Sequence, residues 1–192
     1  MDAPTTSFPK GRILAVAGLI LFAAATVWIN YKVKGDVQGG RGGGAVREMG
    51  SVKFGQPAPD FSALDLSNRM VSLADYRGRK VVLLDFWATS CSPCRMETVG
   101  LQTLQDKFNA ARFEVLSLNQ QEAADQVSQF IHRKQYGFHV LLDNGAVSGK
   151  YGVRGIPTLV LVDTNGIVQW LQVGYSADDD DLRKKIEDLT RQ

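Results

Sequence analysis

A pair of cysteines, Cys91 and Cys94, constrains this chain more than any other feature, because its 192 residues contain no other cysteine. An apolar run over residues 80–86 precedes the pair and is typical of a strand buried on both faces. Apolar residues with helical spacing follow it over residues 93–110. This order of strand, cysteine pair and helix predicts that Cys91 lies where a helix begins.

A cysteine at the start of a helix is close to free N–H groups and to the positive end of the helix dipole, and both stabilise a thiolate. Pro93 fits the first helical turn, where its missing N–H is no loss. We therefore expect Cys91 to be the attacking thiolate and Cys94, one turn deeper, to be the resolving thiol. Such a pair can alternate between a dithiol and a disulfide.

Three other uses of the cysteines are open from the residues alone. A structural disulfide across this spacing closes too short a loop to stabilise the fold much. A zinc site would need two more ligands, and the only histidines, His132 and His139, are spaced more widely than is usual. A cysteine hydrolase would not need the second cysteine. Thiol-disulfide chemistry is the favoured hypothesis, and we expect neither a metal nor another cofactor.

The N-terminal part of the chain predicts a membrane anchor. Residues 13–29 carry no charge and have basic residues on both sides. With these flanks, residues 13–31 approach the roughly 20 residues that cross a bilayer, after a short tail of residues 1–12. A cleaved signal peptide is the alternative, since small residues lie within the run. Residues 32–51 are glycine-rich and predict a flexible linker to one domain, residues 52–192.

That domain alternates between expected strands and helices, which predicts an α/β sandwich. We expect strands at residues 113–118, 158–162 and 167–173, and helices at residues 123–136 and from Ser176 to near Gln192. A turn signal at residues 163–166 joins the last two strands as a hairpin. The net charge of +2 comes with no basic, aromatic-rich stripe, so a nucleic-acid partner is not expected.

Three motifs resemble a known family. Phe86-Trp87-Ala88, Cys91-Ser92-Pro93-Cys94 and Gly155-Ile156-Pro157-Thr158 are similar to the thioredoxin superfamily and, within it, to the redoxin branch of TlpA/ResA-like membrane-anchored disulfide reductases. The resemblance covers about residues 52–190. It implies a thioredoxin-like three-layer α/β/α sandwich with an added N-terminal β-hairpin, which residues 55–61 and 71–78 resemble.

The resemblance also assigns roles to single residues. It implies that Cys91 and Cys94 form the redox disulfide, and that Asp85 and Glu97 are buried acids that move protons during exchange. From the residues alone, an ordinary strand-end acid and an ordinary exposed helix carboxylate are the favoured interpretation of these two residues. The resemblance further implies a cis peptide bond before Pro157 and a substrate-binding surface formed by Trp87, Ser92, Pro93, Ile156 and Pro157.

The implied activity is that of a thiol-disulfide oxidoreductase that reduces protein disulfides outside the cytoplasm, those of apocytochrome c among them. Its electrons would come from a membrane donor of the thioredoxin-reducing type. The basic residues that flank residues 13–29 tie at two on each side, so the extracytoplasmic orientation rests on the resemblance.

Two other functions of the same fold compete with this activity. A peroxiredoxin-like peroxidase would need a hydroxyl residue and a proline at the positions of Ala88 and Leu84. A copper chaperone or binding module would have a wider CxxxC spacing and a histidine partner. Neither pattern is present in this chain.

Overall fold

The computed structural model describes residues 44–108, 110–177 and 179–191. The chain divides into two compact units, Met1–Arg41 and Gly42–Gln192, and the described residues belong to the second. The expected tail, the expected membrane anchor and most of the expected linker therefore lie outside the described residues. Within the described ranges, no helix has the length and apolar character needed to cross a membrane.

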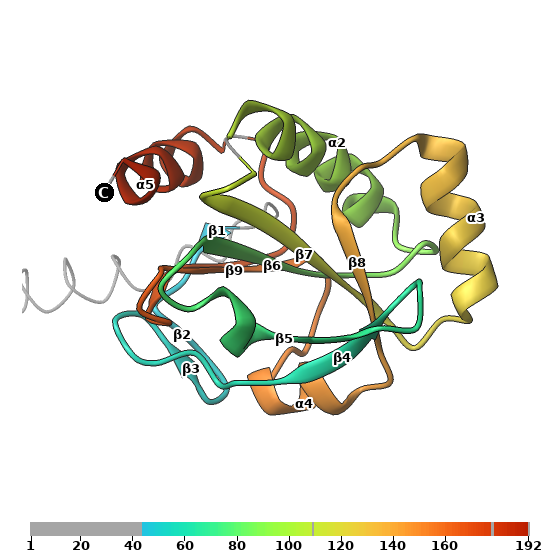
Figure 1. Ribbon diagram of the computed structural model, residues 1–192, viewed down its shortest axis with the longest axis horizontal. Helices are drawn as coiled ribbons and strands as arrows, with labels where there is room; N and C mark the ends of the chain where they lie inside the picture. Colours follow the sequence, from blue (N-terminus) through green and yellow to red (C-terminus); the bar gives the residue numbers. More distant parts are fainter. Residues whose placement is uncertain (1–43, 109, 178, 192) are drawn as a thin grey trace, which may run out of the picture. The chain divides into compact units, whose positions relative to one another are not determined.

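A mixed sheet of eight strands forms the centre of the domain, in the order β1-β10-β9-β6-β7-β8-β4-β5 (Figure 1). The central strands β6, β7 and β8 are parallel, so their carboxyl ends meet at one edge. The strands β9 and β10 are antiparallel to each other, and β9 is antiparallel to β6. The strands are β1 (Gly44–Ala45), β4 (Ser62–Asp65), β5 (Met70–Ser72), β6 (Val81–Trp87), β7 (Phe113–Gln120), β8 (His139–Asp143), β9 (Thr158–Val162) and β10 (Val168–Val173).

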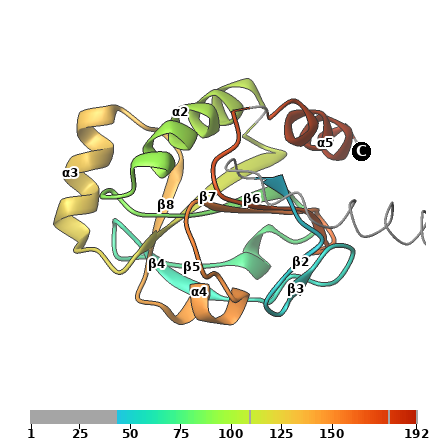
Figure 2. The same ribbon diagram turned by 180° about the vertical axis from the view of Figure 1, so that it is seen from behind.

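Helices cover both faces of this sheet, which gives three layers (Figures 1 and 2). One face packs against α2 (Ser92–Lys107), α3 (Ala124–Lys134) and α5 (Asp180–Thr190). The other face packs against α4 (Ala146–Tyr151), the short 3-10 helix η1 (Leu73–Tyr76) and the small ribbon of β2 (Glu48–Met49) and β3 (Val52–Lys53). This arrangement is the thioredoxin-like α/β fold that the resemblance implies.

The strand β6 contributes to both cores because all of its residues are buried. Its side chains alternate between the faces, as strand geometry requires. Val81 and Leu83 belong to the core under α2, whereas Val82, Leu84 and Phe86 belong to the core over α4. The same alternation puts Asp85 on the α2 side, among apolar neighbours.

A hairpin of β4 and β5 is added to the N-terminal part of the domain; the two strands pair antiparallel and join the sheet through β8. Of the two segments expected for it, residues 71–78 overlap β5 and contain η1, whereas residues 55–61 precede β4. Several elements were not expected from the sequence: the strands β1, β2, β3 and β8, the helix α4 and the 3-10 helix η1. All are short, and such segments carry little periodic signal. The last helix begins at Asp180 with Asp179 as its N-cap residue, four residues later than the expected start at Ser176.

The boundary of the expected linker also differs from the structure. The strand β1 pairs with β10, with Gly44 opposite Val173, so residues 44–51 belong to the folded domain. Gly50 and Gly152 make the close approach that holds this segment. A Cβ atom on Gly152 would lie 2.6 Å from the Gly50 Cα atom, and both residues have positive φ. Glycine is the residue that tolerates both conditions.

Candidate active site

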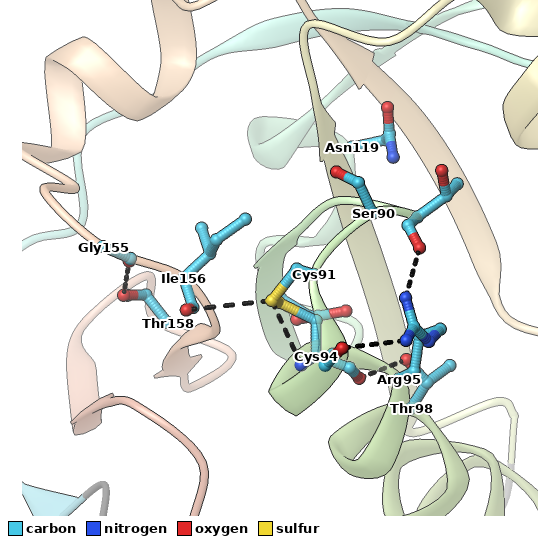
Figure 3. The surroundings of a disulfide bond; sticks show 12 residues. Ser90, Cys91, Cys94, Arg95, Thr98, Asn119, Gly155, Ile156 and Thr158 are labelled. Carbon is cyan, nitrogen blue, oxygen red and sulfur yellow. Dashed lines mark hydrogen bonds between the residues drawn. A yellow bond between two sulfur atoms is a disulfide. The ribbon is translucent and has the colours of Figure 1, made fainter.

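The two cysteines form a disulfide at the carboxyl end of β6, with an S–S distance of 2.03 Å (Figure 3). Cys91 is the N-cap residue of α2, and Pro93 lies in the first turn. The backbone N–H of Cys94 points at the Cys91 sulfur, 3.2 Å away. Cys91 is partly exposed, whereas Cys94 is 1% exposed. Cys91 is therefore the sulfur that a partner can reach, and a thiolate there would accept the N–H of Cys94.

The loop before β9 forms the opposite wall of the site. The Ile156–Pro157 peptide bond is cis, and the carbonyl oxygen of Ile156 lies 3.9 Å from the Cys91 sulfur (Figure 3). The Thr158 hydroxyl donates a hydrogen bond to the Gly155 carbonyl oxygen at 2.7 Å, which fixes the turn. Ile156 is partly exposed and Pro157 is buried. The backbone of Ile156 therefore lies beside the exposed sulfur.

Ser92 and Pro93, which lie between the two cysteines, are exposed and can be reached by a partner. Arg95 follows them, and its guanidinium donates to the Thr89 carbonyl oxygen at 3.1 Å and to the Ser92 hydroxyl at 2.9 Å. The Arg95 guanidinium is thus hydrogen-bonded to the segment around the cysteines and is not directed at their sulfurs. In the described part of the chain, no Lys, Arg or His side chain forms a hydrogen bond to either sulfur.

Trp87 does not have the exposed position that a substrate-binding residue needs. Its side chain is 1% exposed, and its ring centroid lies 5.5 Å from that of Phe130. The expectation that it contacts substrate was wrong because the side chain of this strand-end residue points into the core under α2 and α3. Trp87 instead supports the floor of the site.

Two buried carboxyl groups lie on the α2 side of the sheet, where Cys94 is also buried. Asp85 is 1% exposed, and burial raises its pKa to about 7 although the Ser117 hydroxyl donates a hydrogen bond to it at 2.8 Å. Glu97 is 3% exposed and follows Cys94 by three positions on the helix. Burial and, to a smaller extent, the nearby charges of Asp85 and Asp179 together raise the pKa of Glu97 to about 9. Near neutral pH Glu97 therefore holds its proton, whereas Asp85 is divided between the acid and the carboxylate.

Comparison with known proteins places this site in a family. The model of the AhpC/TSA family matches residues 54–171. This chain belongs to the AhpC/TSA family. It is 37% identical over 131 residues to the thioredoxin-like protein YneN of Bacillus subtilis, a match that covers 67% of this chain and 75% of YneN.

Two further similarities concern the activity. The chain is 34% identical over 143 residues to the thiol-disulfide oxidoreductase ResA of Geobacillus thermodenitrificans, covering 74% of this chain and 81% of that protein. A crystal structure of a candidate thiol:disulfide interchange protein DsbE from Chlorobium tepidum superposes with a TM-score of 0.68 at 34% identity, covering 73% of this chain and 99% of that one. Together with the cysteine pair, these similarities make the protein a thiol-disulfide oxidoreductase whose substrates are protein disulfides.

One residue that holds the loop before Cys91 was not predicted from the sequence. Glu122 follows β7 and accepts hydrogen bonds from the Thr89 N–H at 2.7 Å, the Thr89 hydroxyl at 2.8 Å, the Ser90 N–H at 3.3 Å and the Asn119 amide at 2.8 Å. Burial alone would raise the pKa of Glu122, but these hydrogen bonds outweigh it and lower the pKa. An acid directly after the end of a central parallel strand is the signal that could have indicated it.

The contacts of Glu122 also bear on the peroxidase alternative. Ala88 has no hydroxyl, and the hydroxyl of its neighbour Thr89 donates to the Glu122 carboxylate. The hydroxyl that a peroxidase would need three positions before its reactive cysteine is thus absent, and the nearest substitute is engaged elsewhere.

Proposed function

We propose that this oxidoreductase works as a reductant, with Cys91 as the nucleophile. The Cys91 thiolate attacks one sulfur of a substrate disulfide, which forms a mixed disulfide and releases one substrate thiolate. Cys94 then loses its proton and attacks the Cys91 sulfur, which releases the second substrate thiolate. The products are a reduced substrate and the Cys91–Cys94 disulfide, so two electrons pass to the substrate.

The two buried carboxyl groups would manage the proton in the second step. A group whose pKa lies near the working pH is suited to act as a base, and the pKa of Asp85 is about 7. We assign Asp85 as the acceptor of the Cys94 proton. Glu97, which holds its proton more tightly, is the acid that can return a proton to a departing thiolate. Two acids with separated pKa values are a frequent basis for such paired roles.

The observation that carries the reducing direction is the burial of Asp85 and Glu97 on the side of the sheet where Cys94 is buried. Oxidants of this kind stabilise their thiolates, which makes the dithiol a poor electron donor. Negative charge near Cys94 has the opposite effect, because it disfavours a second negative charge. Ser92 and Pro93, between the cysteines, add no positive charge.

The proposed setting is the outer side of a membrane. Residues 13–31 would anchor the chain, and the glycine-rich segment that follows would let the domain reach membrane-bound partners at a raised effective concentration. Among protein disulfides, we propose the CxxCH segments of apocytochrome c as substrates. A membrane electron donor of the thioredoxin-reducing type would restore the dithiol. These assignments are supported by the resemblance to membrane-anchored disulfide reductases.

Cell fractionation combined with protease accessibility tests the proposed setting. The full-length chain should be recovered with the membranes, because the apolar segment favours burial in lipid. Protease added to sealed spheroplasts should digest the domain. In a control without protease, the domain should stay intact. Recovery of the full-length chain in the soluble fraction would contradict the anchor, and a domain protected from added protease would contradict the orientation.

A further inference from the structure

Gln172 is a buried polar side chain in β10 that the sequence did not single out. It is 2% exposed and lies opposite Leu159 of β9 and Ala45 of β1. Its amide Nε2 donates a hydrogen bond to Glu97 Oε1 at 3.2 Å, across a separation of 75 residues in the sequence. Burying an amide is unfavourable unless it is hydrogen-bonded. The hydrogen bond to Glu97 therefore accounts for the buried glutamine at this position.

Two further contacts fix which end of the amide faces Glu97. The indole N–H of Trp170 lies 3.4 Å from Gln172 Oε1, and an indole can only donate. The carbonyl oxygen of Gly174 lies 3.4 Å from Gln172 Nε2, and a carbonyl can only accept. Reversing the amide would oppose donor to donor and acceptor to acceptor at these contacts. The NH₂ end of Gln172 must therefore point at Glu97.

This orientation determines where a protonated Glu97 carries its proton. Because Oε1 accepts the N–H of Gln172, the acid proton belongs on Oε2. Glu97 Oε2 is buried and has no hydrogen-bond partner among the residues that the structure describes. The oxygen that carries the proton is thus the one that no described residue engages in a hydrogen bond.

We propose that Gln172 is a positioning residue that holds the Glu97 carboxyl with its exchangeable proton on Oε2 and sets how readily this carboxyl gives up that proton. The inference rests on the proposed acid-base role of Glu97. Trp170 acts on Glu97 only indirectly, because its indole keeps the Gln172 amide in the required orientation.

The charges around Glu97 make the sign of the effect clear. Burial raises the pKa of Glu97, and the carboxylates of Asp85 on β6 and Asp179 before α5 raise it further. The N–H of Gln172 acts in the opposite direction, because a donor stabilises the charged carboxylate more than the neutral acid. Removing this donor should therefore raise the pH at which Glu97 ionises.

The test is the Gln172→Leu variant of the full chain, followed by the pH dependence of disulfide exchange with a model disulfide and by carboxyl NMR of Glu97. The midpoint of the pH titration that is assigned to Glu97 should rise by about one pH unit, which corresponds to tenfold tighter binding of the proton. Gln169→Leu is the matched control, because Gln169 lies on the same strand and its amide donates instead to Asp163 at 2.8 Å. That control should leave the midpoint unchanged.

Two more variants separate the possible failures. Glu97→Gln should remove the midpoint altogether, and adding Gln172→Leu to it should cause no further shift. A midpoint that persists in Glu97→Gln would overturn the proposed role of Glu97 itself. A midpoint that disappears in Glu97→Gln but stays in place in Gln172→Leu would overturn only the role of Gln172.

Trp170→Phe tests the same idea without disturbing the buried amide directly, and it serves if Gln172→Leu does not fold. Loss of the indole N–H should move the Glu97 midpoint in the same direction by a smaller amount, since Gly174 still holds Nε2. An unchanged midpoint in Trp170→Phe, together with an unchanged or unobtainable one in Gln172→Leu, would count against the proposal.

Discussion

Replacing Cys91 by serine is expected to abolish disulfide exchange, whereas replacing Cys94 by serine should trap the reaction half-way. Cys91 is the partly exposed sulfur at the start of α2, and Cys94 is buried behind it. Without Cys91 there is no nucleophile, so the rate should fall by several orders of magnitude. Without Cys94 the first attack still occurs, but the mixed disulfide has no resolving thiol and should accumulate as a covalent adduct.

Mass spectrometry under non-reducing conditions measures the adduct, and alkylation rate against pH measures which thiol is the more reactive. Cys94→Ser should be alkylated quickly near neutral pH, because the remaining Cys91 thiolate is stabilised at the helix start. Cys91→Ser should be alkylated slowly. Faster labelling of Cys94 than of Cys91 near neutral pH would contradict the assignment of the nucleophile.

Asp85→Asn is expected to stabilise the protein while it slows catalysis. The pKa of Asp85 is about 7 in the folded protein, against an ordinary value of 3.8. At pH 4 Asp85 is protonated in the folded protein and only partly ionised in the unfolded chain, so the acid makes little difference to stability. As the pH rises toward 7, the unfolded chain ionises but the folded protein does not, so the wild-type protein loses stability. At pH 8, Asp85→Asn should therefore be more stable by roughly 4 kcal/mol.

Urea denaturation of the disulfide form at pH 4 and pH 8 measures this difference. The exchange rate should fall by roughly 10²-fold in the same variant, the usual contribution of a general base. Asp65→Asn is the matched control. Burial would raise the pKa of Asp65, but hydrogen bonds from Arg69, His139 and Ser67 lower it to about 2. Asp65→Asn should therefore destabilise the protein at pH 8, and the same sign for both variants would contradict the account.

The motif around the cysteines predicted much of the site. A buried strand, Cys91 at a helix start and two acids near Cys94 follow from local spacing together with the family resemblance. The predicted strand at residues 158–162 is β9 residue for residue. The cis bond before Pro157 came from the resemblance alone, because a single proline in a sequence is more often trans.

Other features depend on which way a side chain points or on distant partners. Trp87 is the last residue of β6, and its burial depends on α3, whose Phe130 packs against it. Gln172 and Glu122 meet their partners only after the sheet has assembled, and of the two only Glu122 has a local signal, its place after a central parallel strand. Six-residue α4 is too short to form from its own propensity and requires the core for its stability.

The equilibrium reduction potential of the Cys91–Cys94 pair tests the central claim most directly. The protein would be equilibrated with glutathione or dithiothreitol buffers of graded composition, and the dithiol fraction would be counted by alkylation. A reductant with buried carboxyl groups near Cys94 should have a potential well below about −200 mV. A potential near about −120 mV would mean that the protein oxidises its substrates, and it would contradict the proposed direction of electron flow.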